Sequence, residues 1–138
     1  MASVTLPRAD YTDRFATTSD RPHSALEWAR AAFEPASLTD SRQLVWRLVL
    51  QLRLGLLDDP GHVAGWAVAE SRDDVLVLAS ESWHLTGRLV FEAGPEGAAL
   101  TTRVTFKNTA GRLVWAALAP VHRRAVPDIL AAARRRLD

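Results

Sequence analysis

The side chain best placed for chemistry in this sequence is His122, which lies in an apolar stretch near the C-terminal end. On a helix that advances ~100° per residue, His122 falls near the middle of an arc that contains Val114, Leu118, Val121 and Ile129. An imidazole titrates near neutral pH, so a histidine that faces a cavity can act as a general acid or base. The position also suits a buried neutral imidazole that holds a bend in the helix. The sequence leaves both interpretations open.

A second pair of titratable groups, Glu81 and His84, is three positions apart in a strand-like stretch. On an unbroken strand the two side chains point to opposite faces, whereas an intervening turn or bulge would let them converge. The four histidines, which include His23 and His62, show neither the His-x-x-x-His nor the Glu-x-x-His spacing of a helical metal site, and the chain has no cysteine. We therefore expect no metal site and no cofactor.

Composition sets the class of protein. The chain has 138 residues, of which 48% are hydrophobic and 24% charged, the values of a soluble globular domain. This length predicts a single domain over residues 1–138. No apolar run has the length of a signal peptide or of a membrane span, so a cytoplasmic location is expected. The net charge of +1 gives no indication of nucleic-acid binding.

The first elements are a short strand and a capped helix. Residues 9–17 alternate in polarity and favour a strand, with Asp13 on the same face as its aromatic neighbours. Ser24 and Glu27 have the spacing of a capping box, in which each side chain accepts from the other residue's backbone amide. The helix that follows ends before Pro35, because a proline disfavours helical geometry at the preceding residue.

A second short helix is expected to begin near Asp40 and to run through residues 42–53. Its side chains are mostly apolar, apart from a narrow polar stripe formed by Gln43, Arg47 and Gln51. The turn signal at residues 58–61, Asp-Asp-Pro-Gly, separates this helix from the strands that follow.

Residues 62–108 change to a period of two, which is typical of strands. We expect four strands over 62–70, 75–82, 84–93 and 98–108 that form an antiparallel meander. The boundary at residues 82–84 contains neither glycine nor proline. With the first strand, the count is five.

The longest helical pattern covers residues 109–137 and carries Pro120 and Pro127 about 180° from the apolar arc. Proline removes a backbone hydrogen bond and bends a helix, and on the outer side it suits a helix that curves around a core. The predicted fold class is therefore α+β. A curved antiparallel sheet would wrap around a long, kinked C-terminal helix, with two short helices after the first strand.

The end of the last strand and the start of the long helix carry a specific run of residues: Asn108, Gly-Arg-Leu from Gly111, Trp115, Pro120 and His122. With this run and the order of elements, the chain resembles the START-like superfamily, also called SRPBCC or polyketide-cyclase-like. Within it, the chain resembles a bacterial domain family of unknown function. The resemblance covers most of the chain and implies a helix-grip fold. Such folds usually have more than five strands, so either two strands are fused in this count or the grip is smaller and more open.

The resemblance, the buried histidine and the five tryptophans together predict a ligand pocket between the sheet and the last helix. Aromatic side chains commonly line such cavities, although packing in an ordinary core is their more frequent use. The predicted lining is Trp66, Trp83, His84, Phe91, Phe106, Trp115 and His122.

The leading hypothesis for function is a domain that binds a small hydrophobic, lipid- or polyketide-like molecule as a monomer or homodimer. One alternative is a cyclase- or dehydratase-type enzyme, as the resemblance implies, in which His122 moves protons together with Asn108 or Glu81. The other alternative is an accessory interaction domain with a filled core.

Overall fold

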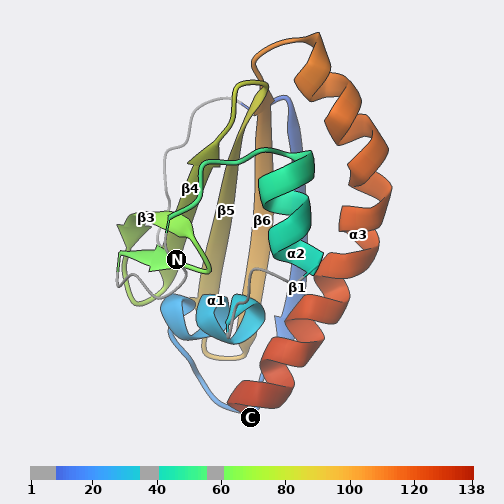
Figure 1. Ribbon diagram of the computed structural model, residues 1–138. Helices are drawn as coiled ribbons and strands as arrows, with labels where there is room; N and C mark the ends of the chain where they lie inside the picture. Colours follow the sequence, from blue (N-terminus) through green and yellow to red (C-terminus); the bar gives the residue numbers. More distant parts are fainter. Residues whose placement is uncertain (1–8, 35–40, 56–60) are drawn as a thin grey trace.

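One antiparallel sheet with helices on one of its faces makes up the fold (Figure 1). The structure, a computed structural model, describes residues 9–34, 41–55 and 61–138. Six strands follow the spatial order β1-β6-β5-β4-β3-β2, so the sheet is open, with β1 and β2 at its edges. The long C-terminal helix α3 runs along the sheet beside the shorter helices α1 and α2 (Figure 1). The predicted α+β class is confirmed.

The strands pair in a regular antiparallel register. Their bounds are Tyr11–Thr18 (β1), His62–Val63 (β2), Trp66–Ser71 (β3), Val75–Glu81 (β4), Leu85–Gly94 (β5) and Gly97–Phe106 (β6). The first strand of the chain, β1, therefore pairs with the last one, β6, and forms one edge of the sheet. Alternation places one set of side chains from β4, β5, β6 and β1 on the face that the helices cover.

One predicted strand is two strands in the structure. The segment expected over residues 62–70 reverses at Ala64 and Gly65, and Val63 pairs with Trp66. Both turn residues have positive φ, 51° and 94°, as a two-residue hairpin turn requires. Alanine is rarely found in that region of backbone space, so the Ala-Gly pair gave no turn signal. The described residues therefore contain six strands and not the predicted five, because the prediction fused β2 and β3 into one.

The turn between β4 and β5 forms without glycine or proline. The Ser82 hydroxyl oxygen accepts the backbone N–H groups of His84 and Leu85, at 3.3 and 3.2 Å. A serine that bonds to its own backbone in this way can replace the usual turn residues. The predicted boundary at residues 82–84 is therefore a real turn.

Helix α1, Ala25–Phe33, starts as expected. Ser24 accepts from the Glu27 amide at 3.1 Å, and Glu27 accepts from the Ser24 amide at 3.0 Å. The helix ends at Glu34, whose backbone is extended. Pro35 lies outside the described residues.

The second helix is shorter than predicted. It consists of α2, Ser41–Leu44, and a π-helical turn η1, Val45–Val49. Gln51 has a φ of 54°, which ends the helical path before the predicted limit at residue 53. The predicted start near Asp40 lies outside the described residues.

Two residues of the predicted polar stripe, Gln43 and Arg47, pack inward, whereas Gln51 is exposed. Gln43 is 1% exposed, and its amide donates to the Ala64 carbonyl oxygen at 2.6 Å. Arg47 donates to Gln43 and to the Gly55 carbonyl oxygen. These bonds satisfy the buried polar groups. Gln43 and Arg47 thereby connect the helix to the β2–β3 turn.

Helix α3, Thr109–Leu137, is capped by Asn108, which accepts from the Gly111 amide at 3.1 Å. Both Pro120 and Pro127 are exposed, so their predicted place on the outer face is confirmed. The buried face contains Trp115, Ala119, Val126, Leu130 and Ala133.

The predicted apolar arc of α3 does not coincide with the face that is buried in the structure. Val121, which was placed inward, is 64% exposed. The buried face is displaced by about one position, because the first turn is fixed by the contact of Gly111 with His84. The predicted arc instead borders the pocket described below.

Candidate functional site

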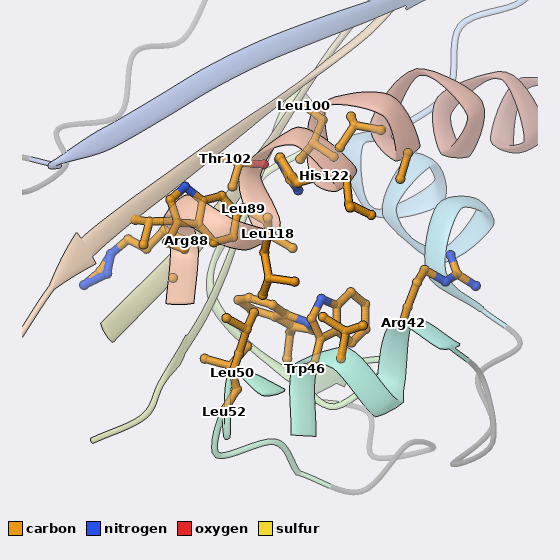
Figure 2. A pocket seen from close by; sticks show the side chains of 18 of the residues that line it. Arg42, Trp46, Leu50, Leu52, Arg88, Leu89, Leu100, Thr102, Leu118 and His122 are labelled. Carbon is orange, nitrogen blue, oxygen red and sulfur yellow. The ribbon is translucent and has the colours of Figure 1, made fainter. Parts of the chain in front are cut away.

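A pocket of about 310 Å³ lies between the sheet, the η1 turn and helix α3 (Figure 2). Its walls come from β3, β5 and β6 on the sheet side and from α1, α2, η1 and α3 on the helical side. Nearly all of the lining atoms are apolar. The volume is at the lower end of the range for small-molecule sites.

Three of the predicted lining residues, Trp66, Trp115 and His122, line this pocket. Trp66 lies across β4 from Gly87, where an added Cβ would come within 3.3 Å of the indole ring. The glycine therefore makes room for the indole to lie flat against the sheet. Trp115 and His122 approach from α3, with ring centroids 5.2 Å apart.

The other four predicted residues do not line the pocket. Trp83 is 57% exposed, because the β4–β5 turn directs it outward. His84 is buried in the same turn, where its Nδ1 lies 2.8 Å from the Ser82 hydroxyl. Phe91 is fully buried against the Phe33 ring. Phe106 lies partly buried at the far end of β6.

The proposed proton-transfer partners of His122 are also elsewhere. Glu81 pairs with Lys107 at 3.0 Å on the surface, and it does not converge with His84. The Asn108 side chain caps α3 and donates to the Trp83 carbonyl oxygen at 3.1 Å. Both side chains are therefore engaged in holding the β4–β5 turn region and the start of α3.

The partner of His122 is Asp13, on the inner face of β1. The imidazole Nε2 lies 3.1 Å from Asp13 Oδ2, and the side chains are only 19% and 11% exposed. The two atoms are at ion-pair distance, although their geometry is not that of an aligned hydrogen bond. The Tyr11 hydroxyl donates to the same Oδ2 at 2.6 Å. Arg123 donates to the tyrosine oxygen from the surface at 3.4 Å.

These neighbours shift the pKa values of the acidic groups. Burial would raise the pKa of Asp13, but the interactions with His122 and Tyr11, with the charges of His122 and Arg123, outweigh it and lower the pKa. Burial raises the pKa of Tyr11, and its hydrogen bond to Asp13 adds to the shift. At neutral pH the group is therefore an Asp13 carboxylate with a neutral Tyr11 phenol.

Thr102 completes a polar cluster that we define as Asp13, Thr102 and His122. Thr102 is 4% exposed, lines the pocket, and is directly opposite Asp13 in the β1–β6 register. Thr102 comes from β6 and His122 from α3, and both side chains line the pocket (Figure 2). Asp13 Oδ1, Thr102 Oγ1 and His122 Nε2 are all buried without a hydrogen-bond partner.

Asp13 and Thr102 were not predicted as site residues. The only sequence signals are a carboxylate on the same strand face as Tyr11 and Phe15, and a hydroxyl between Leu100 and Val104. Each is common in strands, and only the pairing of β1 with β6 brings them together.

The arginines that line the pocket are engaged with the protein or point away from it. Arg42 and Arg88 are the arginines in its lining. Arg42 donates to the Ala32 carbonyl oxygen and lies over the Phe33 ring. The Arg88 guanidinium points away from the pocket (Figure 2).

In the part of the chain that the structure describes, no group of three or more His, Asp or Glu side chains is placed to hold a metal ion. None of the described helices is long and apolar enough to span a membrane.

A comparison with known families gives one match. A family model described as "Protein of unknown function (DUF2867)" matches residues 5–129. Neither the curated proteins nor the solved structures contain a significant match.

Proposed function

The chain belongs to the DUF2867 family, and we propose that it is a START-like helix-grip domain that binds a small apolar molecule in the pocket between the sheet and α3. The observation that carries this proposal is the pocket itself, about 310 Å³ in volume and walled by aromatic and aliphatic side chains. Native cores are packed without such spaces, and an unfilled cavity of this size lowers stability. A fold that keeps it is expected to use it.

The edge of the pocket supports entry of an apolar molecule. Val45 of η1 and Val121 of α3 both border the pocket and are 36% and 64% exposed. These apolar side chains belong to different helical segments, so a small separation of η1 from α3 would widen the entrance. A π-helical turn such as η1 is often found at functional positions. A filled core, the basis of the accessory-domain alternative, does not fit this arrangement.

The proposal predicts that the protein binds a neutral hydrophobic dye and that filling the pocket abolishes binding. Ala125 lines the pocket on α3, whereas Ala117 is exposed on the same helix. We expect the fluorescence of N-phenyl-1-naphthylamine to rise on binding to the wild type and to Ala117→Phe. Ala125→Phe should weaken this binding at least about tenfold, because the new ring occupies the same space.

The result that would contradict the proposal is equal dye binding by the wild type and Ala125→Phe. Circular dichroism of both variants provides the control for folding. Native mass spectrometry of the wild type would add the mass of any molecule that co-purifies with it.

A second candidate function is proton transfer on the bound molecule. It is favoured by the distance of 3.1 Å between His122 Nε2 and the Asp13 carboxylate, because a carboxylate can orient an imidazole and stabilise its protonated form. The sequence-based alternative of a cyclase- or dehydratase-type enzyme requires such a group.

Proton transfer is testable with a small bicyclic ketone. An enzyme of this kind would accelerate exchange of the acidic C–H protons of 2-tetralone in D₂O, followed by NMR, and His122→Gln would lose the acceleration. Exchange at the same rate in both proteins, with the ketone bound, would leave binding as the function.

A further inference from the structure

We propose that the pocket selects neutral molecules that carry a hydroxyl group on an apolar ring body, and that Asp13 and Thr102 are the residues that recognise this hydroxyl. The inference rests on the proposed binding function and specifies the ligand class for the same pocket. Neither residue was predicted from the sequence.

The first argument is the convergence of buried polar atoms that have no partner. Thr102 lines the pocket and lies directly opposite Asp13 in the β1–β6 register. Thr102 Oγ1 and Asp13 Oδ1 are both buried without a hydrogen-bond partner, and Asp13 lies next to the lining residues without lining the pocket itself. His122 Nε2 is close by, 3.1 Å from the other oxygen of the same carboxylate. Most buried polar atoms in native proteins have hydrogen-bond partners. Two of these exceptions belong to residues that line the apolar pocket, Thr102 and His122, and the third belongs to Asp13 beside them. Together they indicate a place for a polar group of a ligand.

The second argument concerns what kind of group fits there. An ionised carboxylate only accepts hydrogen bonds. Of the two oxygens of Asp13, Oδ2 already interacts with both Tyr11 and His122. Oδ1 therefore needs a donor. The Thr102 hydroxyl can donate to or accept from the same ligand atom. A ligand hydroxyl satisfies both residues at once, because it donates to Asp13 while it accepts from Thr102.

The third argument excludes an anionic head group at this place. A ligand carboxylate would put a second negative charge beside Asp13, which is unfavourable in a site with little water. Arg123 is the arginine whose charge acts on this group, and it already lowers the pKa of Asp13, so it balances the existing carboxylate and not a second one. Of the arginines in the lining, Arg42 donates to the Ala32 carbonyl oxygen and Arg88 points away from the pocket (Figure 2). We therefore infer a neutral alcohol or phenol.

The apolar body of the ligand is defined by the remaining walls. Trp46, Trp66 and Trp115 all border the pocket, and the Trp46 and Trp66 rings meet edge to face with centroids 5.5 Å apart. Indole rings offer wide flat surfaces for ring systems. A bicyclic molecule whose hydroxyl points to Asp13 and Thr102 meets these requirements.

The experiment compares three naphthalenes that differ in one substituent. Displacement of bound N-phenyl-1-naphthylamine is measured with 2-naphthol, 2-methylnaphthalene and 2-naphthoate at pH 7. In the wild type, 2-naphthol should bind about tenfold or more tightly than 2-methylnaphthalene, because a methyl group leaves the carboxylate oxygen buried and unpaired. Binding of 2-naphthoate should be the weakest.

Variants assign the preference to particular residues. Thr102→Val should reduce the tenfold preference for 2-naphthol to about twofold or less, whereas Thr102→Ser, which keeps the hydroxyl, should retain most of it. Asp13→Asn removes the negative charge, so its affinity for 2-naphthoate should rise relative to 2-naphthol. Circular dichroism identifies any variant that fails to fold, and in that case the wild-type comparison of the three naphthalenes still decides.

The possible outcomes separate this inference from the proposed function. Equal affinity of the wild type for 2-naphthol and 2-methylnaphthalene would overturn the inference while the binding function stands. It would mean that Asp13 and Thr102 bond only to each other or to water. If neither compound nor the dye binds, the proposed function itself fails. A preference for 2-naphthol that persists unchanged in Thr102→Val and Asp13→Asn would also overturn the inference, because other groups would then recognise the hydroxyl.

Discussion

At the scale of single residues, Asp13 has the most demanding environment in the described chain. Its carboxylate is only 11% exposed and lies beside His122 and Thr102, which line the apolar pocket. Burial of a charge is costly unless donors compensate for it. Tyr11 and His122 compensate one oxygen, and the other is buried without a hydrogen-bond partner. The same carboxylate thus holds His122 in place and supplies an acceptor for a ligand.

Acidification tests this role of Asp13. Its pKa in the folded protein is lower than the ordinary value of 3.8, so the folded state binds this proton less readily than the unfolded state. The resulting stabilisation is fully present above the unfolded pKa and is lost as pH falls through the folded pKa. We expect the wild type to lose more stability than Asp13→Asn between pH 5 and pH 2, as measured by urea unfolding.

At pH 7 the same substitution should lower the free energy of unfolding by about 1–3 kcal/mol, because it removes a charged acceptor of Tyr11. Asp138 also has a lowered pKa, owing first to its bond with the Asp20 amide. That group is common to both proteins and cancels in the comparison. Parallel pH profiles would show that Asp13 does not stabilise the fold through its charge.

His122, Trp66 and Trp115 could be assigned to the pocket from sequence, because a helical period and a count of large aromatic residues are local signals. Asp13 and Thr102 could not. Their meeting depends on the register in which β1, near the N-terminus, pairs with β6, and no local pattern encodes a register between distant strands. Trp83 was misplaced because a turn at Ser82 directs it to solvent.

At the scale of elements, the start of α3 is fixed by a close contact with the β4–β5 turn. Gly111 lies so near His84 that a Cβ would overlap the His84 carbonyl oxygen. Asn108 bonds to both segments and caps the helix. This contact sets the rotation of α3, which determines that His122 reaches Asp13.

Replacement of this glycine should therefore destabilise the protein. Glycine to alanine within a helix normally increases stability, but here the added methyl group must displace backbone. We expect Gly111→Ala to lower the free energy of unfolding by about 1–3 kcal/mol, the cost of overpacking, in chemical denaturation. Gly94→Ala is the matched control, since nothing lies within 4 Å of its added Cβ. If Gly111→Ala were as stable as Gly94→Ala, the contact of Gly111 with His84 could not be what sets the rotation of α3.

Elements with strong local signals were predicted well. The capping box at Ser24 and the outward prolines of α3 agree with the structure. The errors arose where tertiary contacts override local preference. Ala64 adopts a left-handed conformation in a turn, and the Gln43 side-chain amide stabilises this turn by donating to the Ala64 carbonyl oxygen. Gln51 also has a left-handed conformation, which ends the second helix before the end of the apolar pattern that predicted it.

At the scale of the whole molecule, the helices cover one face of the sheet (Figure 1). Between them and strands β5 and β6 the pocket remains unfilled (Figure 2). α1 and the end of α3 close one end, where Asp138 accepts from the Asp20 amide and from Ser19 at 2.9 Å. The pocket lies further along α3, between the sheet and η1. The rigid closure of one end and the apolar entrance beside η1 are what a small-molecule site requires.

The most direct test of this account is a crystal structure of the protein with 2-naphthol. We expect the ring system among Trp46, Trp66 and Trp115, with its oxygen within about 3 Å of both Asp13 Oδ1 and Thr102 Oγ1. A pocket that stays empty or holds only water at saturating 2-naphthol would contradict the binding function. A bound ring whose hydroxyl points toward Val45 and Val121 would contradict the assignment of Asp13 and Thr102.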